Sequence, residues 1–225
     1  MIYREAGQFK ATYPADMAIF PIMQDRWGLA VVLMIAFFFV PFDLLVMPGI
    51  IGAPVFFTEH LLGSMVLPFL LWSLAAIGLN LLTGYTGQLS LGHGAFMAVG
   101  AYAAYNIATR IPEMPIIIVF ILAGLVTAFC GVLIGIPSLR IKGFYLAIAT
   151  LAAQFFIEWV FGSFAWFTGG SMTMVLDTPP FSIFGYEIES TLDNYYFALI
   201  VVVLMTLGAK NMVRSEIGRA WMAIR

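Results

Sequence analysis

Charged residues are scarce in this sequence. Only 10% of its 225 residues are Asp, Glu, Lys or Arg, whereas 62% are hydrophobic. A water-soluble domain carries roughly a quarter charged residues, because its surface must face water. The charges present here cannot cover a soluble globule, so the composition predicts an integral membrane protein. The net charge of −2 gives no reason to expect nucleic-acid binding.

Residues that bind metals or act as nucleophiles are also few. The sequence has one cysteine, Cys130, and two histidines, His60 and His93, which lie far apart. No Cys, His or carboxylate group shows the spacing of metal ligands, so no metal site is predicted. The Gly-Lys-Ser/Thr end of a P-loop is missing as well. We therefore expect a protein that is not an enzyme, that binds no cofactor itself, and that relies on another chain for any ATP hydrolysis.

Long apolar segments predict an all-α polytopic bundle of about six transmembrane helices. Each spanning helix needs about 20 mainly apolar residues. The expected spans are residues 27–47, 61–82, 95–108, 115–136, 143–161 and 194–209. This divides the chain into an N-terminal segment (1–26), a transmembrane domain (27–209) that includes a long polar loop (162–193), and a C-terminal segment (210–225).

The basic residues indicate how these spans are oriented. If there are six spans and the N-terminus is cytoplasmic, nine of the ten Lys and Arg residues face the cytoplasm and only Arg110 lies outside. Cytoplasmic loops of membrane proteins carry this excess of positive charge. The pattern therefore predicts that the N-terminus and residue 225 are cytoplasmic, and that loop 162–193, which has no Lys or Arg, is external.

Small residues recur every fourth position in two of the predicted spans. Such rows let two helix backbones approach closely, although chance composition is the alternative. The rows are Ala123, Thr127, Gly131 and Gly135 in the fourth span, and Gly100, Ala104 and Ala108 in the third.

Residues 78–96 interleave polar side chains with glycines between two apolar runs. One interpretation is a broken or re-entrant element that lines a translocation path, because non-helical backbone at membrane depth needs protein or water to satisfy it. The other is a polar cytoplasmic turn with helix caps. The candidate pathway residues are Asn80, Thr83, Gln88, Ser90 and His93, and the glycines that would give the backbone freedom are Gly84, Gly87, Gly92 and Gly94.

This stretch resembles the signature of inner-membrane permease subunits of branched-chain amino acid ABC transporters. Further stretches, at 137–151, 167–170 and 213–225, are similar to motifs of the same family in the same order. The resemblance covers about residues 61–225. After the Thr-Gly-Gly motif this chain has Ser171 where the family often has another glycine. Family members continue past the last of these motifs, so we expect this chain to be truncated at its C-terminus.

The resemblance implies a permease subunit of the high-affinity leucine, isoleucine and valine type in the bacterial inner membrane. Its partners would be membrane lipid, a second permease subunit, two cytoplasmic ATPase subunits that bind ATP, and a periplasmic binding protein. Thr168, Gly169 and Gly170 would form the motif of the external loop. Arg214, Gly218, Arg219 and Arg225 would couple the chain to the ATPase, although anchoring to anionic lipid explains these arginines equally well.

Two alternative functions remain open. One is a permease for urea or short amides within the same family. The other is a self-contained secondary transporter or channel, which would need an ionisable residue deep in a helix. Glu158 belongs to the fifth span, but we expect it to reach the external interface rather than the centre of the bilayer.

Overall fold

The structure is a computed structural model that describes most of the chain. The described residues are 23–39, 60–112, 114–138, 141, 143–168, 181–183, 186–188 and 190–224. The N-terminal half contains the helices α2 (Met23–Met34), η1 (Ile35–Phe39), η2 (Leu62–Val66), α5 (Leu67–Asn80), η3 (Leu81–Tyr85) and α6 (His93–Arg110). The C-terminal half contains α7 (Ile116–Ser138), α8 (Phe144–Ser163), α9 (Ala165–Thr168), β1 (Phe181–Ile183), β2 (Tyr186–Ile188), α10 (Thr191–Arg214) and α11 (Glu216–Ile224).

Four helices in the described part are long and apolar enough to cross a membrane. They are Leu62–Tyr85, Ile116–Ser138, Phe144–Ser163 and Thr191–Arg214, with 20 to 24 residues each. At about 1.5 Å per residue, the shortest of them reaches about 30 Å, which is the thickness of the hydrocarbon core. The first of the four joins η2, α5 and η3 into one helix with a π-turn at each end.

The predicted number of six spans stays a prediction. The remaining two expected spans correspond to α2 with η1 and to α6, and neither is among the four long apolar helices. Residues 40–47 of the first expected span lie outside the described residues. The last expected span was too short, since its helix begins at Thr191 and continues to Arg214 instead of ending at residue 209.

One packed cluster joins α5 to α10. Leu62 and Leu70 lie against Tyr195 and Leu199, and all four are buried. Residues of η1 pack on the same cluster, and the Tyr195 hydroxyl donates to the Ala36 carbonyl at 2.8 Å. Because a hydroxyl that leaves water must find a partner, this bond fixes η1 against the start of α10.

A second cluster joins α6 to α8, and α7 packs along α6. Ala95 and Val99 of α6 are buried against α8. The prediction of close packing is confirmed where α6 meets α7, since a Cβ added to Gly100 would lie 3.1 Å from Thr127 Oγ1. The row in α7 is not in contact throughout, because the same test at Gly135 finds nothing within 4 Å.

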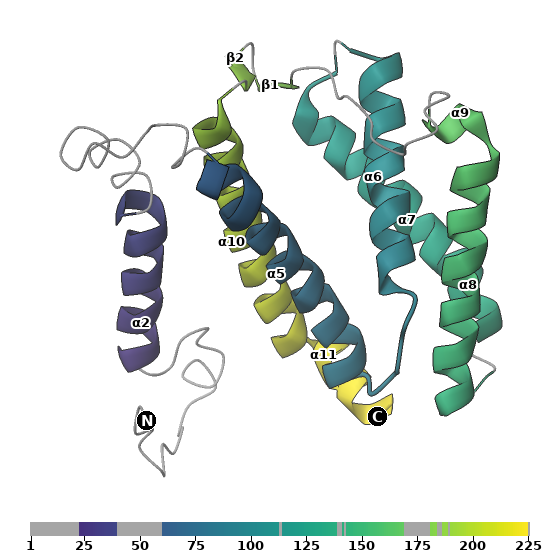
Figure 1. The fold of residues 1–225 in the computed structure, drawn as a ribbon. Coiled ribbons are helices and arrows are strands. Elements are labelled where there is room, and N and C mark those ends of the chain that lie inside the picture. The colour runs from purple at the N-terminus through teal and green to yellow at the C-terminus, as the bar shows by residue number, and fades with distance from the viewer. Residues whose placement is uncertain are drawn as a thin grey trace.

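The two ends of the bundle differ in character (Figure 1). One end carries α9 and the hairpin of β1 and β2, which pair antiparallel with Phe181 opposite Ile188. The other end carries α11 and the C-terminus. The all-α expectation is thus confirmed for the helical bundle, with a short hairpin added in the loop between α9 and α10. This loop was predicted as a non-spanning connection, but a hairpin in it was not predicted.

Candidate functional site

The glycine-rich stretch interrupts the helices, which both interpretations predict. Helix η3 ends at Tyr85, residues 86–92 are non-helical, and α6 begins at His93. In Figure 1 this non-helical segment runs from the lower end of the helix labelled α5 to the start of α6, which lies part-way up the bundle. Gly87 has a φ of 70°, which lies in the left-handed region that glycine adopts without a steric cost. The reversal of the chain therefore depends on a glycine at this position.

The helix that leads into the interruption is already widened to a π-turn. In a π-turn the usual backbone bonds between residues four apart are displaced, and such turns are frequent at functional sites. Two threonine hydroxyls bond the carbonyls four residues before them: Thr83 Oγ1 donates to the Leu79 carbonyl at 2.9 Å, and Thr86 Oγ1 donates to the Leu82 carbonyl. These hydroxyls support the turn and are engaged with their own helix.

Helix α8 holds the interruption in place. The Leu91 N–H donates to Thr150 Oγ1 at 3.0 Å, and Thr150 in turn donates to the Ala147 carbonyl. Gly92 is buried directly beside this threonine, and an added Cβ would lie 2.5 Å from the Thr150 carbonyl oxygen. Because Thr150 is six residues past the first residue of α8, this contact lies about 9 Å along that helix. The end of the non-helical stretch therefore packs against α8, where its Leu91 N–H is satisfied by protein.

The first residues of α6 pack between two other helices. His93 lies on Gly78 of α5, where an added Cβ would be 3.4 Å from the imidazole Cε1. On the other side Gly94 faces α8, and an added Cβ would lie 3.6 Å from Gln154 Oε1. The half-buried imidazole thus packs in the bundle, as expected for most histidines in such a position.

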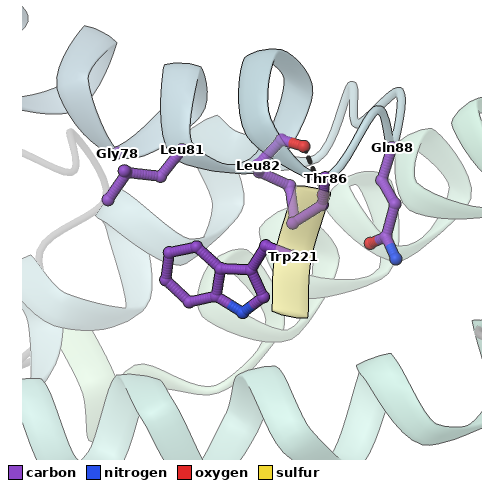
Figure 2. Close-up of a pocket in the computed structure, with 6 residues that line it drawn as sticks. All are labelled: Gly78, Leu81, Leu82, Thr86, Gln88 and Trp221. Carbon is purple, nitrogen blue, oxygen red and sulfur yellow. Dashed lines mark hydrogen bonds between the residues drawn. The ribbon is translucent and has the colours of Figure 1, made fainter. Parts of the chain in front are cut away.

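A cavity of about 420 Å³ opens beneath the π-turn (Figure 2). The indole of Trp221, from α11, faces Leu82 across it, and the Gln88 amide lies at one side. The remaining lining residues are Gly78, Leu81 and Thr86. The C-terminal helix therefore closes over the same turn from which the non-helical stretch begins.

The structure separates the other predicted pathway residues. Asn80 is exposed, and its side chain lies over Gly84, where any Cβ would overlap the Asn80 Oδ1 atom. Ser90 is half-buried within the non-helical stretch. Of the five candidates, Gln88 alone lines the cavity, while Asn80 and Thr83 face their own helix.

At the opposite end of the bundle, α9 is bound to the end of α6. Thr168 is buried with 5% of its surface exposed, whereas Gly169 and Gly170 lie outside the described residues. Asn106 donates to the Phe167 carbonyl at 2.9 Å. The guanidinium of Arg110 lies 3.7 Å from the centre of the Trp166 ring and donates to the Trp166 carbonyl at 3.1 Å. These bonds fix α9, which ends at the first residue of the predicted external motif, to the end of α6.

The C-terminal segment 210–225 contains the end of one helix and the whole of another. Arg214 ends α10, and α11 turns back after Ser215 to pack on η3. Gly218 is buried under the Val213 backbone, where any Cβ would overlap the carbonyl oxygen, so this glycine permits the tight turn. Arg219 is exposed on α11, and Arg225 lies outside the described residues.

Sequence reasoning missed the residues that α8 and α11 bring to this site. Thr150 and Gln154 lie inside a run that was predicted as an ordinary span, and Trp221 was not singled out. The available signal was the four-residue spacing of Thr150, Gln154 and Glu158, which places polar side chains on one face of an apolar helix. In the described part of the chain, no group of three His, Cys, Asp or Glu residues could hold a metal ion.

Comparison with known proteins supports the resemblance. The family described as branched-chain amino acid transport system, permease component, matches residues 61–225. The chain belongs to this family. The region matched contains the interrupted helix, the α8 contacts and α11, so the whole site described above is part of the family's domain.

Two curated relatives carry the same description. The high-affinity branched-chain amino acid transport system permease protein LivM of Salmonella typhimurium is 30% identical over 179 aligned positions, which take in 69% of this chain and 42% of the relative. LivM of Escherichia coli is 29% identical over the same shares. The chain therefore spans less than half the length of these relatives. No solved structure gives a significant match.

Proposed function

We propose that this chain acts as a permease subunit of an ABC importer, and that it moves branched-chain or related hydrophobic amino acids into a bacterial cell across the inner membrane. The observation that carries the proposal is the family match over residues 61–225. The geometry supports it, since non-helical backbone reaches into a bundle of membrane helices and is satisfied there. Backbone of this kind is found where it is packed in protein or lines a cavity.

The proposed division of labour places ATP on other chains. Two cytoplasmic ATPase subunits would bind and hydrolyse it, a second permease subunit would complete the path, and a periplasmic binding protein would deliver the amino acid. α11 would contact the ATPase, and this is supported by Arg219, which is exposed, and by Trp221, which lines the cavity under the π-turn. Movement of α11 would then act on the helix end from which the interruption begins.

The proposed orientation places α11 and both chain ends in the cytoplasm. Basic residues described at that end of the bundle are Arg26, Lys210, Arg214 and Arg219, whereas Arg110 is at the opposite end with α9. This split follows the excess of positive charge on the cytoplasmic side. Residues 1–26 and 210–225 would accordingly be cytoplasmic or begin a cytoplasmic element, and 27–209 would form the transmembrane domain.

The proposal assigns the site residues four roles. Gln88, with Ser90 and His93, would offer dipoles to a zwitterionic substrate, while Gly84, Gly87, Gly92 and Gly94 shape the backbone around them. Thr168 with Gly169 and Gly170 would present the external motif to the binding protein. Arg214, Gly218, Arg219 and Arg225 would serve the ATPase contact.

Co-purification from membranes tests this assignment. The chain is expressed with the candidate ATPases, once intact and once without residues 216–225, which removes α11 and the final residue and leaves α10 complete. We expect the intact chain to retain an ABC-type ATPase pair and the shortened chain to lose it. Equal capture by both forms, or no capture by an intact chain that elutes as a single monodisperse species, would contradict the proposal.

A further inference from the structure

Helix α8 has a polar face that the proposed site leaves unexplained. Thr150, Gln154 and Glu158 recur every four residues, so they lie one above the other on one side of the helix. Ile157 and Phe161, on the same side, are buried in the cluster with α6. Thr150 and Gln154 are half-buried beside this cluster and Glu158 is exposed, so the polar row starts against the bundle and ends at its edge.

The opposite side of α8 is of another kind. Phe155, Phe156 and Trp159 are each about 60% exposed and are large and apolar, as expected of a face in contact with lipid. Helix α8 therefore has an exposed aromatic face on one side and a polar row on the other. This separation would not be needed if the helix were surrounded by lipid on all sides.

Each member of the polar row has a defined neighbour. Thr150 accepts the hydrogen bond from Leu91, Gln154 faces Gly94, and Gln154 Nε2 donates to Glu158 Oε1 at 3.0 Å. The row thus begins at the interrupted stretch and continues about 12 Å along α8 toward the external end. It ends at a carboxylate five residues before Ser163, about 8 Å below the end of the helix.

A carboxylate at this depth is costly, and such residues usually face a bundle interior or a water-filled cavity. Glu158 accepts this hydrogen bond from a neutral amide. The bond therefore does not neutralise the negative charge of the carboxylate. Position 158 is expected to reach the interface, and the exposed carboxylate there is joined to the half-buried Gln154 by this hydrogen bond.

We propose that the face formed by Thr150, Gln154 and Glu158 borders an aqueous path through the bundle, and that the Glu158 carboxylate binds the ammonium group of an amino acid in this path. The charge of the carboxylate complements the ammonium, and the neighbouring amide and hydroxyl are neutral dipoles that suit a zwitterion. The second half of this inference rests on the proposed function, whereas the first half does not.

The aqueous path is tested by the accessibility of single cysteines. Cys130 is first replaced by alanine, and Glu158→Cys and Gln154→Cys are then compared with the lipid-face variants Trp159→Cys and Phe155→Cys, each at almost the same depth as its counterpart. Full-length chain in native membranes, with its partner subunits co-expressed, is exposed to a charged thiosulfonate. A small uncharged maleimide confirms that each thiol can react.

Because only a hydrated thiol ionises and reacts readily, we expect labelling at 154 and 158 to be at least about tenfold faster than at 155 and 159. Equal rates at 158 and 159 would show that Glu158 merely reaches the interface and would overturn the proposal. Labelling does not depend on which substrate is carried or on ATP, so this result stands apart from the co-purification test above.

The ammonium contact is tested by uptake. Glu158→Gln removes the charge with almost no change in size, and Glu158→Asp keeps the charge. We expect Glu158→Gln to reduce leucine uptake about tenfold or more while Glu158→Asp retains most of it, since charge-assisted hydrogen bonds are the strong ones. Normal uptake by Glu158→Gln, at equal abundance in the membrane, would overturn this assignment even if the labelling succeeds.

Discussion

Replacing Gly92 by alanine should unfold the site where the interrupted stretch meets α8. The added Cβ would lie 2.5 Å from the Thr150 carbonyl oxygen, 3.2 Å from its carbonyl carbon and 3.3 Å from the Thr150 Cβ. Two of these three atoms belong to the α8 backbone, so no side-chain rotation can relieve the overlap. The chain must instead move away from α8.

The cost has two parts. Overpacking in a well-packed interior costs about 1–3 kcal/mol. Moving the chain away also breaks the Leu91 hydrogen bond to Thr150, which contributes about 0.5–1.5 kcal/mol. We therefore expect Gly92→Ala to lower the free energy of unfolding by about 2–4 kcal/mol. For a chain of this size that lowers the thermal midpoint by about 5–15 °C.

Gly124 provides the matched control. It lies inside α7, and a Cβ added there would have nothing within 4 Å. Alanine is the better helix former, so Gly124→Ala should leave the midpoint unchanged or raise it slightly. Thermal unfolding of the fluorescently tagged chain in mild detergent measures both variants. Equal midpoints for Gly92→Ala and Gly124→Ala would refute the close packing described here.

Three further perturbations probe the other contacts. Trp221→Ala should loosen α11, because its indole lines the cavity under the π-turn, and protease cleavage near residue 215 should speed up about tenfold, whereas exposed Met222→Ala should not change it. Gly218→Ala should open the α10–α11 turn and abolish ATPase capture, while Gly208→Ala, which has open space around it, should not. Asn106→Ala should cost about 1–3 kcal/mol by leaving the Phe167 carbonyl unpaired, measured as a lower thermal midpoint; an unchanged midpoint would refute its role.

The sequence predicted the helices well and the contacts between them poorly. Apolar runs gave the α7 and α8 spans to within two residues of the observed ends, because burial in lipid is a property of each segment alone. Glycines among polar residues indicated the interruption, although they left open whether it was a surface turn. The depth of the interruption depends on Thr150, which is far away in the chain, so local patterns could not reveal it.

Several candidate residues contact neighbours that the sequence did not indicate, and the reason is the same for each. Asn80 and Thr83 look like pathway residues because they are polar, but a helix can use such side chains to support its own backbone. Gly218 looks like part of a partner contact, yet its neighbour is the preceding turn of the same chain. The sequence shows which side chains can form hydrogen bonds, whereas their partners are known only from the fold.

The hydroxyl of Thr150 serves as both acceptor and donor, and this determines which parts of the molecule move together. It accepts a hydrogen bond from the Leu91 N–H and donates one to the Ala147 carbonyl, so it fastens the end of the interrupted stretch to α8, beside the apolar cluster that packs α6 on the same helix. Any tilt of α8 is then transmitted to α6. A rotation of α5 against this pair must be absorbed in the few residues between Tyr85 and Leu91. We therefore expect the hinge of the bundle at Gly87, whose neighbours Thr86 and Gln88 line the same cavity as Trp221.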